Sequence, residues 1–204
     1  MYSTRPGLIL AFHGCDISVQ NKVLNGKSEL NFSENTFDWL GSGIYFWEYS
    51  QERALEYARR LSKQKHHNNN IKKPAVLGAV IDLGHCLDLI EYKNLQLLKE
   101  NYESFREIQI ASGFDLPENK KGGSLNDLLL RDLDCAIIEF IHQSRVDLNL
   151  KPYDSVKGVF LEGDEIYPDA GFKEKNHVQV CIRNPNCIKG FFLPRVLNDR
   201  YPTV

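Results

Sequence analysis

The sequence predicts one α+β domain. Its 204 residues are enough for a single well-packed core and too few for two ordinary domains. Strand-like segments lie near both ends of the chain, and helical patterns dominate the stretch between them. This order differs from the regular alternation of strands and helices that builds a parallel sheet. We therefore expect a mainly antiparallel core with a helical insertion over about 91–150.

The first third of the chain predicts a strand, a loop and a helix. Residues 8–14 (LILAFHG) form an apolar run that ends at a glycine, as buried strands do. Residues 33–43 (SENTFDWLGSG) have the small residues of a loop that lies close to a ligand. Residues 51–64 predict an amphipathic helix, because apolar side chains recur there at helical spacing: Ala54, Leu55, Ala58 and Leu61.

The middle predicts a polar loop at 65–73, a buried strand at 75–83 and then helices from about 94 to 147. The segment 118–124 (ENKKGGS) divides the helical region, and Ser124 is expected to cap the second helix. The apolar stripe of that helix is expected to contain Leu125, Leu128, Leu129, Ala136, Ile137 and Phe140.

The last quarter predicts three strands, at 157–163, 178–184 and 188–194. A polar loop, 164–176, separates the first two. No G-x-G-x-x-G motif follows the first predicted strand, which argues against a Rossmann domain or a Walker-type ATPase.

Composition narrows the class of protein. Hydrophobic residues make up 42% and charged residues 25%, with a net charge of -2, as in ordinary soluble domains without a global attraction to nucleic acid or membrane. No apolar run approaches the ~20 residues of a membrane span, and the N-terminus lacks a signal-peptide pattern, so we expect a cytoplasmic protein. The five cysteines include no C-x-x-C pair, which argues against a disulfide framework or a zinc site. Cys135 and Cys181 lie in apolar surroundings typical of core residues.

His13 and Gly14 stand where the first predicted strand ends. A glycine lets backbone N–H and C=O groups approach a flat ligand, and the adjacent imidazole can hydrogen-bond a ribose hydroxyl. A structural histidine at a strand end is the simpler alternative. Further along, Gly41 and Gly43 lead directly into an aromatic run, where Tyr45 can stack on a planar heterocycle.

The pattern of His-Gly on a first strand, then GSGIYF and a helix, resembles poly(ADP-ribose) polymerases and diphtheria-toxin-type ADP-ribosyltransferases. The resemblance covers roughly residues 8–60 and 157–192. It implies a split core of two mainly antiparallel sheets, with NAD as co-substrate in the cleft and no metal. It further implies that His13 contacts the adenosine ribose, Gly14 holds the nicotinamide carboxamide, and Tyr45 stacks on nicotinamide beyond the turn at Gly43.

The family's third residue is a glutamate at the start of a late strand, and Gln179 stands at that position here. A glutamine keeps a hydrogen bond to the reacting ribose. It loses the negative charge that stabilises an oxocarbenium-like sugar. The departure favours transfer of a single ADP-ribose unit over chain elongation.

Nearby carboxylates can supply the missing charge. Glu162 follows an apolar strand and is a candidate general base toward the acceptor. Asp164 and Glu165 lie in the loop that faces the acceptor in the family, and solvated loop charges are the alternative for all three.

Weaker candidates surround the tyrosine. Ser33 and Asn35 precede the glycine turn and are candidates for the adenosine side. Ser50 lies near a serine that bonds the carboxamide in the family, although a helix N-cap is the competing interpretation. Tyr57 is interpreted as a packing or exposed residue and not as a second stacking ring.

The basic segment 59–73 is interpreted as a solvated helix end and loop, with binding of a phosphate backbone as the alternative. A metal site at His66 and His67 lacks neighbouring ligands, and nothing in the spacing requires one at His13, Cys15, His85 and Cys86.

These observations predict a mono-ADP-ribosyltransferase that moves ADP-ribose from NAD to a macromolecule, with nucleic acid favoured over protein as acceptor. Analogy with compact bacterial domains suggests an intracellular toxin or effector, for which an antitoxin or inhibitor protein would be a partner and a membrane would not. Three alternatives stay open: an NAD glycohydrolase, an RNA 2′-phosphotransferase and a non-catalytic module that binds NAD or ADP-ribose. The family of RNA 2′-phosphotransferases uses further His and Arg residues in place of this tyrosine motif.

Overall fold

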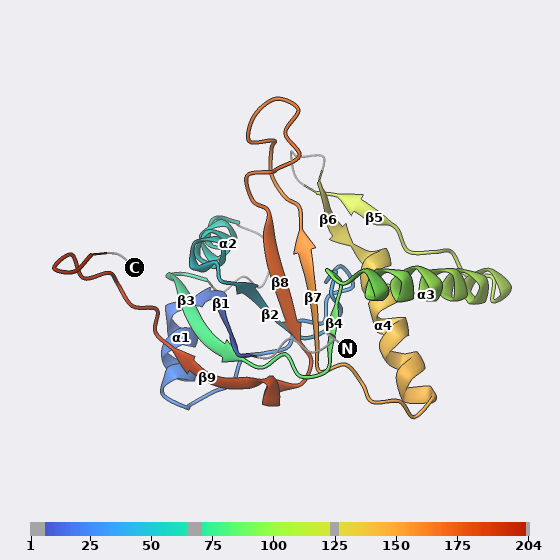
Figure 1. Cartoon of the computed structure of the whole chain (residues 1–204), viewed down its shortest axis with the longest axis horizontal. Coiled ribbons are helices and arrows are strands. Elements are labelled where there is room, and N and C mark those ends of the chain that lie inside the picture. Colours follow the sequence, from blue (N-terminus) through green and yellow to red (C-terminus); the bar gives the residue numbers. More distant parts are fainter. Residues whose placement is uncertain (1–6, 65–70, 123–126, 203–204) are drawn as a thin grey trace.

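The computed structural model describes residues 7–64, 71–122 and 127–202. Within these ranges the chain is a mixed α+β structure with four α-helices and a large, mostly antiparallel sheet (Figure 1). The strands of this sheet are β1 (Ile9–Asp16), β2 (Ile44–Glu48), β3 (Pro74–Ile81), β4 (Cys86–Asp88), β7 (Ser155–Phe160), β8 (His177–Ile182) and β9 (Ile188–Phe192). The helices are α1 (Ile17–Leu24), α2 (Gln51–Lys63), α3 (Tyr92–Ala111) and α4 (Asp132–Asp147).

The seven strands run in the order β4-β7-β8-β2-β1-β3-β9. The described residues therefore contain one seven-stranded sheet where the sequence predicted two packed sheets. The reason is a short ladder between β1 and β2, which pairs Ala11 with Glu48 and Phe12 with Trp47. These two pairs join the half β4-β7-β8-β2 to the half β1-β3-β9.

The predicted strands and the helix at 51–64 are present, and α1, β2 and β4 are additions. Asp16 ends β1 and starts α1, because its carboxylate accepts a hydrogen bond from Ser18 N at 2.9 Å. The predicted insertion also contains a two-stranded hairpin of β5 (Asn119–Lys121) and β6 (Leu128–Arg131).

The expected helical stripe was wrong at Leu128 and Leu129, which lie in β6. A short apolar run fits a strand as well as a helix, and here exposed and half-buried residues alternate along it. Ala136, Ile137 and Phe140 lie in α4 as predicted. The expected cap Ser124 and Leu125 fall outside the described residues.

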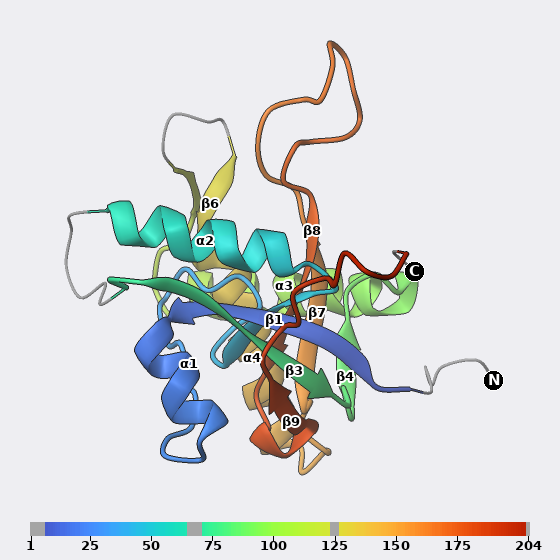
Figure 2. The same cartoon turned by 90° about the vertical axis from the view of Figure 1, so that its left-hand side faces the viewer.

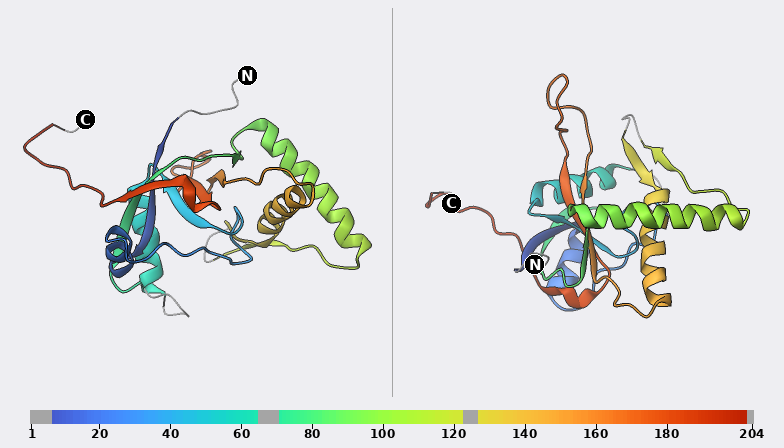
Figure 3. Two further views of the ribbon diagram at one scale, coloured as in Figure 1. Left: turned by 90° about the horizontal axis from the view of Figure 1, so that it is seen from below. Right: turned by 45° about the vertical axis from the view of Figure 1, so that its right-hand side comes forward.

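Helices cover both faces of the sheet. On one face, α1 and the segment around Leu30 pack on Phe46 and Val180. On the other face, α2 packs on Trp47 and Val76, while α4 packs on Leu40, Val156 and Cys181 with α3 beside it. Figure 2 shows α2 lying across β1 and β3, and Figure 3 shows α3 and α4 grouped at the opposite side of the molecule from α1 and α2. None of the described helices is long and apolar enough to cross a membrane.

Candidate functional site

The strands β1 and β2 separate beyond their short ladder. The pairing ends at Phe12 and Trp47, so the next potential pair, His13 and Phe46, and the one after it, Gly14 and Tyr45, are not formed. Tyr49 N donates to Leu10 O at 3.0 Å, which shows that the even-numbered residues of β1 direct their backbone groups toward β2. The N–H and C=O of Gly14 are therefore directed into this separation, which we call the β1–β2 split.

His13 stands at the edge of the split. Its Nδ1 lies 2.8 Å from Tyr45 O, and because a carbonyl only accepts, Nδ1 carries the hydrogen. Burial lowers the pKa of His13, so the ring is neutral and its Nε2 is an acceptor. Among the described residues, Nε2 of His13 has no hydrogen-bond partner. The residue therefore presents a lone pair of the kind that accepts a ribose hydroxyl.

Tyr45 is fixed at its hydroxyl. The hydroxyl donates to Gly41 O at 2.8 Å and accepts from Leu40 N at 3.0 Å. Burial raises the pKa of Tyr45, so the phenol stays protonated. The half-buried ring packs against the cluster that contains Leu40 and Cys181. Tyr45 thus stabilises the glycine turn in addition to lying beside the split.

The glycine turn is closely packed by the protein itself. A Cβ at Gly41, where φ is 79°, would lie 2.6 Å from Glu139 Oε1, and a Cβ at Gly43 would lie 2.5 Å from Cys181 Sγ. Glu139 also accepts from Ser42 N at 2.6 Å and pairs with Arg183 at 2.6 Å. Contact with α4 and β8 is therefore a sufficient reason for both glycines.

Gly14 has a similar structural reason. A Cβ there would lie 2.1 Å from Ala54 O and 3.3 Å from Ala58 Cβ. Helix α2 therefore lies directly against one face of Gly14. A ligand therefore cannot reach the Gly14 backbone from the face that α2 covers, whereas the split opens in the plane of the sheet.

Gln179 lies on β8, opposite Trp47 of β2 and Gly158 of β7. Directly opposed residues share a face, so Gln179 lies on the face that α2 and α4 cover, whereas His13 and Phe46 lie on the other. Trp39 Nε1 donates to Gln179 Oε1 at 2.6 Å. Since the indole only donates, the amide oxygen is the bonded atom, and the Gln179 amide keeps its N–H donors and one oxygen lone pair.

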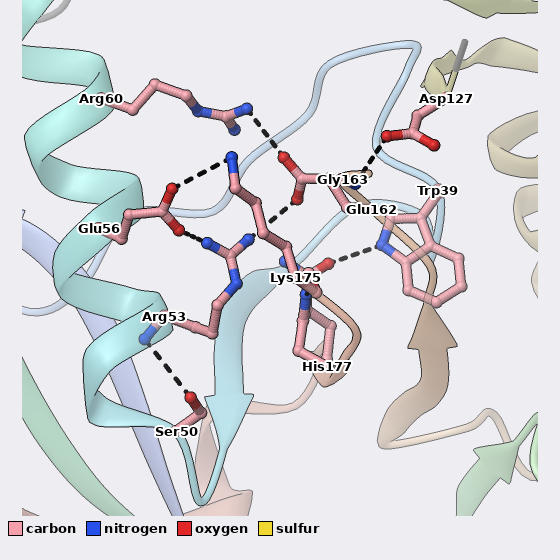
Figure 4. A network of polar contacts seen from close by, with 11 residues as sticks. Trp39, Ser50, Arg53, Glu56, Arg60, Asp127, Glu162, Gly163, Lys175 and His177 are labelled. Atoms are coloured by element: carbon pink, nitrogen blue, oxygen red, sulfur yellow. Dashed lines mark hydrogen bonds and ion pairs between the residues drawn. The ribbon is translucent and has the colours of Figure 1, made fainter. Parts of the chain in front are cut away.

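Glu162 is 5% exposed and lies at the edge of α2. One of its oxygens is 2.9 Å from Arg53 Nη2 and the other is 3.1 Å from Arg60 Nη1 (Figure 4). Both oxygens are occupied by guanidinium groups in this arrangement. Glu162 therefore holds the segment after β7 against α2 and directs no free oxygen at an acceptor.

The weaker candidates have local partners. Ser50 caps α2, because its Oγ accepts from Arg53 N at 3.4 Å. The backbone of Ser33 pairs with Gly43, and Asn35 Nδ2 donates to Ser33 Oγ at 2.8 Å. Tyr57 packs on Trp47 with ring centroids 4.8 Å apart.

The two loop carboxylates are exposed. Glu165 Oε2 accepts from Asp169 N at 3.0 Å, and the backbone of Asp164 pairs with Glu174. His66 and His67 lie outside the described residues. Within the described parts of the chain, no group of three His, Cys, Asp or Glu residues could hold a metal ion.

Sequence reasoning missed Arg53, His177 and Trp39, and it considered Arg60 only as part of the basic segment 59–73. Arg53 and Arg60 are seven residues apart, two turns of one helix, and this spacing could have placed them on one face. His177 is 8% exposed, and nothing in its sequence context indicates that burial. Trp39 reaches Gln179 across a separation of 140 residues, which no local pattern reveals.

Two cavities lie away from the split. One, of about 520 Å³, is lined by Glu139, His142, Tyr153 and Arg183 among others. The other, of about 420 Å³, lies between α3, α4 and Trp39. Neither cavity is lined by His13, Tyr45 or Gln179. The candidate site at the β1–β2 split is therefore identified by its hydrogen-bond geometry and not by the size of a cavity.

Comparisons with known proteins give little functional information. No family model matches the chain, and no solved structure matches it. The chain is similar to an uncharacterized protein of Methanocaldococcus jannaschii, with 24% identity over 199 residues that cover 87% of this chain and 83% of that protein. This likeness assigns neither a family nor a function.

Proposed function

We propose that the protein binds NAD at the β1–β2 split and transfers ADP-ribose to a macromolecule with release of nicotinamide. The observation that carries the proposal is the opening of the ladder at His13 and Gly14. There the imidazole Nδ1 caps Tyr45 O at 2.8 Å and Nε2 stays available as an acceptor. The resemblance of the HG and GSGIYF motifs to ADP-ribosyltransferases supplies the fold and ligand of the proposal.

The residues of the split suit a dinucleotide with hydroxyl and amide groups. His13 Nε2 can accept a ribose hydroxyl, and the backbone N–H and C=O of Gly14 match the carbonyl and amine of a carboxamide. When bound, NAD supplies a ribose whose bond to nicotinamide can break, with positive charge developing on the sugar. The chain's own residues orient the dinucleotide, and Tyr45, held by the glycine turn, would limit its movement.

A test of the proposal uses NAD labelled in its adenosine half and a cell lysate, followed by protease or nuclease digestion of the labelled product. We expect label in macromolecules and release of nicotinamide, and nuclease-sensitive label would identify nucleic acid as the acceptor. Equal, background-level signals from the wild type and from Tyr45→Ala would contradict a transferase.

A matched pair of histidine variants tests the role of His13. We expect His13→Gln to weaken NAD binding roughly tenfold in calorimetry, as loss of one buried hydrogen bond predicts. His85→Gln is the control, because His85 Nδ1 also lies 2.8 Å from a carbonyl, that of Pro152, but far along the sheet. Equal NAD affinity in the two variants would exclude His13 from the site.

One observation favours a second candidate, a protein that binds NAD without efficient transfer. The oxygen of Gln179 already accepts from Trp39 Nε1, so only one lone pair of a neutral amide is left for a ribose hydroxyl. A glutamate would keep that bond with one oxygen and offer the other to the sugar. We therefore expect Gln179→Glu to raise nicotinamide release above wild type, whereas unchanged release in Gln179→Glu and Gln179→Ala would place the residue outside the site. Release without labelled macromolecules would indicate a glycohydrolase.

A further inference from the structure

A cluster of charges lies between α2 and the segment that leaves β7. Arg53 and Arg60 both bind Glu162, and Lys175 Nζ lies 3.3 Å from Glu56 Oε1. Glu56 also pairs with Arg53. The cluster thus has three cations and two carboxylates, and Figure 4 shows all five side chains converging from α2 and from the two arms of the loop between β7 and β8.

Buried polar atoms without partners belong to Arg53 of this cluster, to His177, which the charges of Arg53 and Arg60 influence, and to Trp47, whose ring lies beside that of His177. Trp47 Nε1 and His177 Nε2 have no hydrogen bond among the described residues, and neither does Arg53 Nε. Trp47 is 3% exposed and His177 is 8% exposed, with their rings 6.0 Å apart. A buried polar atom left unpaired costs about 1–3 kcal/mol. Such atoms at one place indicate a partner that the protein itself does not provide.

The unpaired atoms have defined characters. Trp47 Nε1 can only donate, as can Arg53 Nε. His177 Nδ1 lies 2.6 Å from Lys175 O and therefore carries the hydrogen, which leaves Nε2 as an acceptor in the neutral ring. Burial lowers the pKa of His177 to about 4. The cluster thus combines several donors with one acceptor, a set that matches phosphate oxygens beside a hydroxyl.

Glu162 occupies the place that a phosphate would take. Guanidinium groups bind carboxylate and phosphate with the same donor geometry, so one anion can replace the other. Without Glu162 the remaining charges are those of Arg53, Arg60, Lys175 and Glu56, a net charge of about +2, which suits a doubly charged phosphate.

Glu162 lies at the start of a hairpin that pairs with itself. Residues 161–176 pair internally, through Lys175 N to Glu162 O at 2.9 Å and a bridge between Glu165 and Lys173. The hairpin projects from the body of the molecule (Figure 1). Two contacts hold the start of the hairpin: Glu162 binds Arg53 and Arg60 of α2, and Gly163 N donates to Asp127 at 2.8 Å. Release of the Glu162 contact would therefore free this end of the hairpin, and the bond from Lys175 N to Glu162 O beside it would open more often.

We infer that Arg53 and Arg60 form a binding site for the phosphate of a nucleotide, and that Glu162 holds this place until the ligand displaces it. Trp47 Nε1 then donates to the phosphate, and His177 Nε2 accepts a hydroxyl of the attached sugar. The phosphate can belong to NAD, in which case the inference rests on the proposed function, or to the acceptor molecule.

Calorimetric titration with pyrophosphate tests the site. We expect Glu162→Gln to bind pyrophosphate at least tenfold more tightly than wild type, because the competing carboxylate is removed. Arg60→Gln should bind at least tenfold more weakly than wild type. Glu103→Gln is the matched control: it changes net charge by the same amount and breaks an exposed pair with Arg106 on α3, and it should bind as wild type does. Equal affinity in all four proteins, or no binding by any, would overturn the inference.

A second measurement covers the case in which Glu162→Gln does not fold. Pyrophosphate added to wild type should accelerate hydrogen exchange at Lys175 N and the neighbouring amides of the hairpin, and should not do so in Arg60→Gln, whose altered side chain is 40% exposed. Unchanged exchange in wild type at saturating pyrophosphate would exclude displacement of Glu162.

Two further titrations identify the source of the phosphate. Weaker binding of NAD by Arg60→Gln assigns the site to the dinucleotide, and weaker binding of only a 5′-phosphorylated oligonucleotide assigns it to the acceptor. Pyrophosphate binding that depends on Arg60, without nicotinamide release from NAD, would keep this site and refute the proposed function. Nicotinamide release from NAD without pyrophosphate binding that depends on Arg60 would support the proposed function and refute this phosphate site.

Discussion

At the scale of single residues, hydrogen-bond partners determine what each polar side chain can still do. The Nδ1 of His13 is bonded to Tyr45 O, which leaves one acceptor. The oxygen of Gln179 is bonded to Trp39, which leaves the amide N–H donors and one oxygen lone pair. From residue type alone, both side chains could have donated or accepted a hydrogen bond. The two residues also lie on opposite faces of the sheet, so a ligand that contacts both must pass through the split.

Tyr45→Phe separates the two functions of the tyrosine. Loss of the hydroxyl leaves Leu40 N and Gly41 O without their bonds, so we expect the free energy of unfolding to fall by about 1–3 kcal/mol in urea denaturation. The ring is kept, so nicotinamide release should stay near the wild-type rate. Tyr102→Phe is the control, since among the described residues its hydroxyl has no hydrogen bond, and it should change stability little. A similar small change in Tyr45→Phe would show that the turn does not depend on this hydroxyl.

At the scale of elements, the packing of α2 on β1 determines the shape of the split. Ala54 and Ala58 are fully buried, and their small side chains let the helix approach Gly14. The cap at Ser50 sets where the helix starts, and the same first turn carries Arg53 to Glu162. One helix therefore links the split to the charge cluster.

Gly14→Ala tests this packing. The added Cβ would lie 2.1 Å from Ala54 O, a backbone atom that moves only if α2 moves. We expect a loss of about 3 kcal/mol in the free energy of unfolding, as overpacking of a core causes. Gly190→Ala on β9 is the control, because a Cβ there meets nothing within 4 Å. Comparable melting temperatures for the two variants would contradict close packing at Gly14.

At the scale of the whole molecule, the fold buries neutral histidines. Burial lowers the pKa of His142 and of His177 to about 4 in each case, and the ordinary value is 6.5. Between these values the unfolded chain binds more protons than the folded protein. The free energy of unfolding therefore falls as the pH falls from 6.5 toward 4, and this stability is fully present above 6.5.

Urea unfolding at two pH values measures this effect. We expect the free energy of unfolding to be lower at pH 5.5 than at pH 7.5 by about 1 kcal/mol for each of His142 and His177, and His13, whose pKa burial also lowers, adds to the difference. A variant that combines His142→Gln and His177→Gln should lose most of this difference. If the double variant keeps the full difference, the titrating groups lie elsewhere.

The local patterns of the sequence determined most of the elements. The apolar run at 8–14, the helical stripe at 51–64 and the last three strands were predictable, because each depends on a period that neighbouring residues define. Local signals failed at β6, where Leu128 and Leu129 fit a helix equally well. They also failed to predict the single sheet, which depends on two residue pairs between β1 and β2.

The sequence by itself determined the candidate residues of the split, His13, Gly14 and Tyr45, because they stand in short motifs at strand ends. Only the tertiary structure decided what these residues contact. It placed α2 against Gly14, bonded Trp39 to Gln179, and brought Arg53 and Arg60 onto Glu162 across more than 100 residues. Such contacts depend on how the layers pack and on strand register, and residues so far apart leave no local pattern by which sequence could reveal them.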